Sequence, residues 1–115
     1  MNRYLRQINL SGFGEDAQRK LQQAKVLVIG CGGLGIPALQ YLTAMGVGTI
    51  GIVDDDAIEL SNLNRQVSFS EKDAGKLKVE VAKKMLHQQN ASINIHIFKT
   101  PLNVENALQI IGGYD

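Results

Sequence analysis

The chain has little of several features that mark special classes of protein. It carries one cysteine among 115 residues, which excludes an internal disulfide and a cysteine-rich zinc site within it. Aromatic residues make up 5% and the formal net charge is +1, so there is no basic, aromatic-bearing surface typical of nucleic-acid binding. No apolar run approaches the ~20 residues of a membrane span, and the first residues lack the apolar core of a signal peptide. We therefore expect a cytoplasmic protein that binds neither nucleic acid nor membrane.

What remains is the composition of an ordinary globular protein, with 44% apolar and 20% charged residues and a length that suits one small domain.

The most informative stretch begins at residue 25. The apolar run 26–29 predicts a strand buried on both faces of a parallel sheet. A G-x-G-x-x-G follows over 30–35, and then an apolar helix pattern with its buried stripe expected at 34, 38, 42 and 45. Residues 49–53 predict a second strand, which ends at Asp54.

This order of strand, glycine loop, helix and second strand predicts nucleotide binding. Glycines at 30, 32 and 33 allow backbone N–H groups to approach a phosphate, and the start of the following helix favours an anion. The candidate residues here are Gly30, Gly32, Gly33 and Asp54, whose carboxylate can accept hydrogen bonds from a ribose. The alternative is a glycine turn that serves packing alone.

The rest of the chain extends the same pattern. We expect a helix over 15–24, a long polar loop over 55–71, a helix over 75–89, a strand over 93–98 and a short helix over 104–111. The predicted fold class is therefore α/β, a Rossmann-like doubly wound parallel sheet that is incomplete: a βαβαβα unit preceded by an N-terminal helix. We divide it into an arm and helix, 1–24, and a nucleotide-binding half, 25–115.

A fourth strand of such a sheet would begin at Tyr114–Asp115, beside the first strand. Without it, the first strand has an open edge, which is an aggregation hazard. We therefore expect this chain to be a piece of a longer protein or one part of a larger assembly.

Two cations follow the second strand in positions that suit a triphosphate. Arg65 lies in the polar loop and Lys78 begins the next helix, and phosphoryl or nucleotidyl transfer needs cations because negative charge builds on the phosphates. The alternatives are a surface loop cation for Arg65 and a solvated helix face for Lys78. Arg6 stands in an N-terminal segment with little reason to be buried, and by itself predicts only a solvated terminal residue.

Several short motifs together resemble the ThiF/MoeB/HesA family, which contains the bacterial relatives of ubiquitin-activating enzymes. They are R-Y-x-R-Q-I near the start, G-x-G-G-L-G, G-V-G-x-(I/L), the acid at Asp54, S-N-L-x-R-Q and a following K-V. The resemblance covers nearly the whole chain, and S-N-L-x-R-Q is much more specific than the glycine loop.

The resemblance implies an ATP-dependent adenylyltransferase that uses ATP with Mg²⁺ to activate the C-terminal glycine of a ubiquitin-like sulfur-carrier protein, as in thiamine or molybdopterin biosynthesis. It also implies a homodimer and a partner that ends in Gly-Gly. Gly33 resembles the phosphate-loop contact and Asp54 the ribose ligand. Arg65 and Lys78 resemble the phosphate-binding cations, and Arg6 resembles the arginine that reaches into the partner subunit's site. The loop that contacts nucleotide corresponds to Ser61, Asn62, Leu63, Asn64 and Arg65, and Gln66 continues it.

Some family features are not present. In the family, a further aspartate that helps to hold Mg²⁺ follows the fourth strand. The paired C-x-x-C zinc sites of many members and the catalytic cysteine of some also lie downstream. We therefore expect zinc only beyond this chain. We assign no metal ligand here: Asp55 and Asp56 could approach a metal, but we favour turn and loop-start roles for them. Cys31 predicts a small packing residue, and Tyr4 and Phe69 predict packing or interface residues.

Two other functions share part of the pattern. An NAD-binding oxidoreductase domain has the glycine loop and Asp54, but has no use for Arg65 with Lys78. A non-catalytic dimerisation or interaction module has the same fold, although the presence of Asp54, Arg65 and Lys78 argues against a decayed site.

Overall fold

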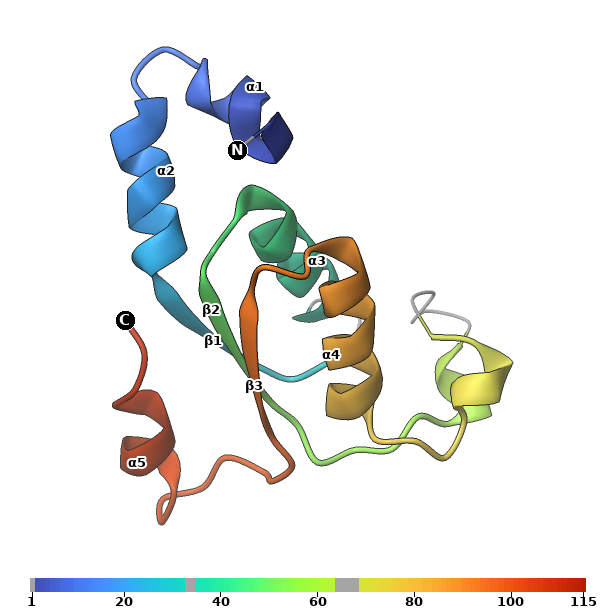
Figure 1. Cartoon of the computed structure of the whole chain (residues 1–115). Coiled ribbons are helices and arrows are strands. Elements are labelled where there is room, and N and C mark those ends of the chain that lie inside the picture. Colours follow the sequence, from blue (N-terminus) through green and yellow to red (C-terminus); the bar gives the residue numbers. More distant parts are fainter. Residues whose placement is uncertain (1, 33–34, 64–68) are drawn as a thin grey trace.

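The structure is a computed structural model that describes residues 2–32, 35–63 and 69–115. Three parallel strands, β1 (Lys25–Ile29), β2 (Thr49–Val53) and β3 (Asn94–Phe98), form a sheet in the order β1-β2-β3. Lys25 lies opposite Thr49, and Thr49 lies opposite Asn94, so the strands start and end together. Their carboxyl ends therefore meet at one edge of the sheet (Figure 1).

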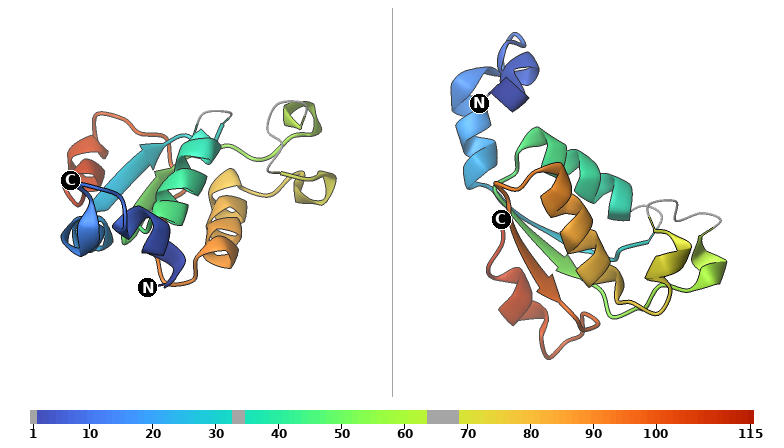
Figure 2. Two further views of the ribbon diagram at one scale, coloured as in Figure 1. Left: turned by 90° about the horizontal axis from the view of Figure 1, so that it is seen from above. Right: turned by 45° about the vertical axis from the view of Figure 1, so that its right-hand side comes forward.

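Helices connect the strands in the predicted βαβαβα order. α3 (Gly35–Met45) and α4 (Lys78–Gln89) cover one face, and α5 (Ala107–Ile111) lies against the other (Figures 1 and 2). Before the sheet come η1 (Asn2–Tyr4), α1 (Leu5–Ile8) and α2 (Gly14–Gln23), and between β2 and α4 come η2 (Leu60–Asn62) and η3 (Glu71–Asp73). The Rossmann-like fold class is confirmed. The longest helix of the described residues has 12 residues, and none there is long and apolar enough to cross a membrane.

The hydrophobic core lies between the sheet and the pair α3 and α4. β2 is the central strand, and four of its five residues are buried because it has a neighbour on each side. Alternate strand residues point to the helices, where they meet apolar residues of α3 and α4. The central members of this core are Leu39, Ile50, Ile52, Val79, Ala82, Leu86 and Ile95.

β1 differs from its prediction as a strand buried on both faces. Its residues are half-buried or exposed, and Ile29 is 57% exposed. The reason is that β1 forms the outer edge of the sheet, where, among the described residues, only Lys25 has a hydrogen-bonded neighbour on the outer side. There the Asp115 N–H donates to the Lys25 carbonyl at 2.8 Å, and the Lys25 N–H donates to the Asp115 carboxylate at 2.8 Å. This contact lies where the fourth strand was expected to begin.

The predicted stripe of α3 is confirmed only at Leu42, which packs half-buried against the core, while Leu34 falls outside the described residues. Ala38 is exposed and Met45 is 41% exposed, whereas the buried residues of α3 are Ile36, Leu39 and Thr43. The sequence of α3 is apolar nearly all round, so the spacing of its apolar residues does not select one face. Packing against the sheet makes that choice.

Two helices begin three residues later than predicted because their first residues make other hydrogen bonds. Gly75 and Lys76 exchange backbone hydrogen bonds of 2.8 Å with Ile58, which delays α4 until Lys78. Ahead of α5, the Asn103 and Asn106 side chains each accept from the other residue's N–H, at 3.0 and 2.9 Å. This reciprocal turn occupies residues that were predicted to be helical.

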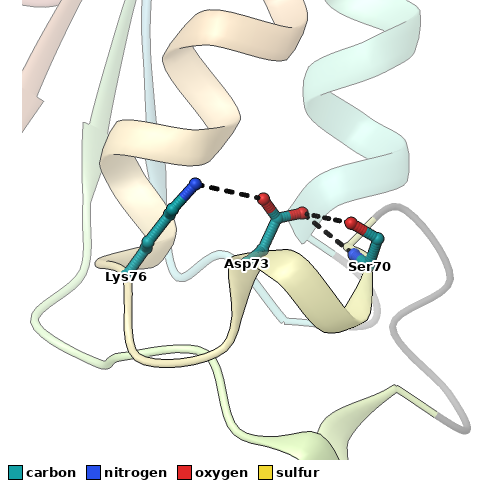
Figure 3. Close-up of polar contacts among 3 residues, drawn as sticks. All are labelled: Ser70, Asp73 and Lys76. Carbon is teal, nitrogen blue, oxygen red and sulfur yellow. Dashed lines mark hydrogen bonds and ion pairs between the residues drawn. The ribbon is translucent and has the colours of Figure 1, made fainter.

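The end of the long polar loop is fixed at η3 by a capping box. The Asp73 carboxylate accepts from the Ser70 N–H at 2.9 Å and from the Ser70 hydroxyl at 3.1 Å, and Lys76 lies 3.9 Å away (Figure 3). The backbone hydrogen bond from Ser70 is the main cause of a lowered pKa of Asp73. Phe69, which is 5% exposed, holds the same segment to the core and confirms its predicted packing role.

Replacing Asp73 with alanine should therefore destabilise the fold in a pH-dependent way. Loss of a capping side chain costs about 1 kcal/mol, or several degrees in melting temperature for a chain of this size. Because the folded-state pKa is lowered, the contribution is complete above the unfolded pKa of about 3.9 and is lost as the pH falls through the lower folded value. Thermal unfolding by circular dichroism at pH 7 and pH 3 checks this. Glu71→Ala, which removes an exposed carboxylate of the same short helix, is the control, and an equal effect of both variants would contradict the prediction.

Candidate functional site

The glycine loop leaves β1 at the carboxyl edge of the sheet and leads into α3. Gly30 has φ +98°, a conformation that other residues rarely adopt. A Cβ on Gly35 would lie 2.1 Å from the Gly30 carbonyl oxygen, so only glycine allows the start of α3 to approach the loop this closely. This backbone conformation and this close approach explain why the first and third positions of the motif are glycines. Gly32 lies between them with open space around its Cα, and Gly33 falls outside the described residues.

Asp54 joins the end of β2 to this loop. One carboxylate oxygen accepts from the Cys31 N–H at 2.7 Å, and the other accepts from the Asp56 N–H at 2.7 Å. Asp54 thus fixes the glycine loop and the turn that follows β2. Each oxygen has a second lone pair, so the half-buried carboxylate still has acceptor capacity. The Cys31 N–H, in contrast, already donates its hydrogen bond to Asp54.

Cys31 is fully buried in the core beneath the loop. Burial is the main cause that raises its pKa to about 12; the Asp54 carboxylate raises it further, and the Lys78 ammonium opposes both. The thiol is therefore neutral at physiological pH, as the predicted packing role requires. Asp54 and Lys78 thus act on the same thiol with opposite signs.

Lys78, the first residue of α4, is not on a solvated helix face. It is 6% exposed, so the alternative that the sequence left open is wrong. Its Nζ lies 4.0 Å from the Asp56 carboxylate, which is itself 69% exposed, and it has no other ion pair among the described residues. Sequence reasoning left Asp56 a turn role or an approach to a metal, and no local spacing links it to a residue 22 positions downstream. The tertiary structure therefore places a nearly buried cation beside the glycine loop with one distant counter-charge.

Three successive carboxylates stand at this edge. The side-chain oxygens of Asp54, Asp55 and Asp56 lie within 4.8 Å of one another. Asp55 and Asp56 are exposed, and Asp56 also accounts for the ion pair with Lys78. Hard oxygen donors of this kind suit Mg²⁺ or Ca²⁺.

The candidate loop after β2 is described in part. Ser61 is exposed on η2, and Leu63 is half-buried against the core. The backbone of Asn62 also belongs to η2. The candidates Asn64, Arg65 and Gln66 fall outside the described residues. η2 and η3 lie side by side, projecting from the side of the sheet that α3 and α4 cover (Figure 2).

Arg6 lies at the opposite end of the molecule from Lys78. Its neighbour Gln7 donates to the Met45 carbonyl, at the end of α3, at 2.8 Å. Arg3 donates to the Gln89 carbonyl, at the end of α4, at 2.8 Å. Since α4 has 12 residues and Lys78 is its first, its two ends are about 17 Å apart. The structure therefore does not bring Arg6 into the site of its own chain.

The fold and this edge define a class, the Rossmann-like α/β domains with a glycine-rich loop at the carboxyl end of a parallel sheet. The chain belongs to the ThiF family, which matches over residues 4–115. It is similar to a sulfur carrier protein adenylyltransferase of Thermus thermophilus, with 44% identity over 115 residues that cover all of this chain and 42% of that protein.

Solved structures show the same likeness. One is E. coli tRNA N6-threonylcarbamoyladenosine dehydratase in complex with ATP, with a TM-score of 0.90 and 28% identity over 98% of this chain and 46% of that one. Another is E. coli MccB with ATP, with a TM-score of 0.83 and 38% identity over 96% of this chain and 35% of that one. The chain thus spans less than half the length of these proteins.

The buried thiol gives a direct test of the loop geometry. Cys31 should resist a thiol reagent such as DTNB in the native protein at pH 8, because its sulfur is buried and its pKa lies near 12. One thiol per chain should react at once when denaturant is added. Rapid, stoichiometric reaction of the native protein would contradict the packing role.

Proposed function

We propose that this chain is the nucleotide-binding part of an ATP-dependent adenylyltransferase that activates the C-terminal glycine of a ubiquitin-like sulfur-carrier protein. The observation that carries the proposal is Lys78, a cation 6% exposed beside the glycine loop. A buried charge is costly unless it is well paired, and its counter-ion is an exposed carboxylate at 4.0 Å. The N-terminus of α4 adds positive potential at the same place. An anionic phosphate would satisfy both.

The neighbouring residues suit the other parts of ATP. The α3 N-terminus and the glycine loop, with Gly30, Gly32 and Gly33, would face the phosphates. Asp54 would accept hydrogen bonds from the ribose with the lone pairs that Cys31 and Asp56 leave open. Arg65 would add a second cation. The remaining loop contacts are proposed at Ser61, Asn62, Leu63, Asn64 and Gln66.

The reaction needs charge stabilisation more than acid–base catalysis. An oxygen of the carrier's terminal carboxylate forms a bond to the α-phosphorus while the bond from that phosphorus to the bridging oxygen breaks. Pyrophosphate leaves with the electron pair, and the carrier retains AMP as an acyl-adenylate. The nucleophile is already ionised at neutral pH, so no base is required. Lys78 and Arg65 would stabilise the charge that develops on the phosphates.

Mg²⁺ fits the same edge. It is usually held by one or two carboxylates together with substrate phosphates, and the clustered oxygens of Asp54, Asp55 and Asp56 supply such donors. When bound, Mg²⁺ would neutralise part of the triphosphate charge. These aspartates would hold the ion, while Lys78 and Arg65 act on phosphate oxygens directly.

Arg6 has a place in this scheme only if a second subunit is present. It lies at the far end of α4 from Lys78, so it would serve the site of the other chain in a homodimer. In this proposal residues 1–24 form the arm that carries Arg6, and residues 25–115 form the nucleotide-binding half. The name of the Thermus thermophilus relative supports a sulfur-carrier partner. The pathway proposed for this carrier is thiamine or molybdopterin biosynthesis.

The alternative, an NAD-binding oxidoreductase domain, shares the glycine loop and Asp54 but leaves Lys78 without a role. Calorimetric titration with ATP and with NAD separates the two. Tighter binding of NAD would overturn the adenylyltransferase proposal.

Lys78→Ala and Arg65→Ala should each lower ATP–pyrophosphate exchange by about 10²–10³-fold in the full-length protein with its carrier, because each removes transition-state charge stabilisation. Lys84→Ala, which removes an exposed lysine of the same helix, should leave exchange unchanged. Circular dichroism checks that all three variants are folded. Normal exchange in Lys78→Ala or Arg65→Ala would refute that residue's assignment.

Arg6→Ala should also lose exchange, and mixing should restore it. In a mixed dimer with Lys78→Ala, the intact site of the Arg6→Ala subunit receives Arg6 from the other chain. Exchange is measured after joint denaturation and refolding of the two variants in equal amounts. Absence of any recovery would rule out action between subunits.

A further inference from the structure

The N-terminal arm is seated on the ends of α3 and α4 by a buried polar network. Its most enclosed contact joins Tyr4, 7% exposed, to Asn90, 1% exposed. The Asn90 amide donates to the Tyr4 hydroxyl at 2.7 Å and to the Thr43 carbonyl at 3.2 Å. Its carbonyl oxygen accepts from the Ser92 hydroxyl at 2.7 Å, so the amide is held on both sides. The predicted packing role of Tyr4 is thus confirmed, but its partner could not be predicted because Asn90 lies 86 positions away.

A second group of contacts holds the other side of α1. Gln18 of α2 is fully buried and donates to the Met45 carbonyl at 3.0 Å. Gln7 donates to the same carbonyl at 2.8 Å and to the Gln18 side-chain oxygen. The arm is thus fixed on both sides of Arg6, by Tyr4 two residues before it and by Gln7 directly after it.

The arm needs these contacts to keep its shape. α1 is four residues long, far below the length at which a helix is stable by itself, and it has no buried apolar residue. Leu5 and Leu10 are 51% and 63% exposed, so the apolar packing of the arm comes mainly from the buried Tyr4 ring. Its position therefore depends on that ring and on the polar contacts of Tyr4 and Gln7 with the body of the domain.

We propose that Tyr4 is a positioning residue for Arg6: its hydroxyl bond to Asn90 fixes the direction in which the arm presents the guanidinium to the site of the other subunit. This inference rests on the proposed function. It also gives α4 a double role, since Lys78 begins the helix at one site and Asn90 follows its end, where it anchors the arm that serves the second site.

The test is Tyr4→Phe, which removes the hydroxyl and leaves the ring, with Tyr41→Phe as the matched control because Tyr41 is 72% exposed on α3. Loss of one hydrogen bond should lower the exchange rate at saturating ATP by about 3- to 10-fold in the full-length homodimer. Amide hydrogen exchange should rise in residues 5–8 and stay unchanged in α4. Tyr41→Phe should match the unaltered protein in both measurements.

Mixing then separates positioning from a general structural effect. In a dimer of Tyr4→Phe with Lys78→Ala, the intact site of the first subunit receives a well-placed Arg6 from the second, so its exchange rate should recover. Unchanged exchange in Tyr4→Phe would overturn the inference. A loss of exchange in Tyr4→Phe that mixing does not restore, while mixing does restore exchange in Arg6→Ala, would also overturn it. Gln7→Met loosens the same arm from a half-buried position, and it decides the question if Tyr4→Phe fails to fold. Absence of exchange in the unaltered protein would instead refute the proposed function.

Discussion

Parallel pairing of three strands in one register is the constraint on which the rest of the structure depends. The pairing continues one step beyond the strands: Gly30 donates to the Val53 carbonyl at 2.7 Å, and Asp54 donates to the Phe98 carbonyl at 3.2 Å. This extension brings the Asp54 carboxylate to the Cys31 N–H and so shapes the glycine loop. The candidate site is therefore part of the sheet's hydrogen-bonded framework, which explains how a short loop keeps a defined form.

Two kinds of buried polar group in the described part of the chain differ in how well they are paired. At the amino end, Gln18 and Asn90 have partners on the protein for their amide groups, and the result is a fixed arm. At the carboxyl edge, Lys78 has a single carboxylate at 4.0 Å. The several hydrogen bonds of Gln18 and Asn90 favour a structural role even though the buried Thr43 hydroxyl has no partner among the described residues, whereas an incompletely paired buried charge favours a ligand. This contrast is the physical reason to place the phosphates at Lys78.

The two ends are joined by α3 and α4. Both helices start beside the candidate site and finish under the arm, so each is a stiff connection between the two regions. In the proposed homodimer, the arm of one chain serves the site of the other chain. The two helices would fix the position of that arm relative to the site of the chain that carries it. A separation of about 17 Å along α4 makes action within one chain impossible without unseating the arm.

The sequence by itself determined the order of the elements, the glycine loop, the acid that ends β2 and the membership of the motifs in one family. These features depend on neighbouring residues and on spacing, which a sequence displays directly. It did not determine that Lys78 is buried, that α3 packs through Ile36 and Leu39, or that Tyr4 meets Asn90. Only the tertiary structure decided these points, because each depends on which distant surfaces come together: an apolar helix offers several faces, and a lysine or tyrosine is buried only where other elements cover it.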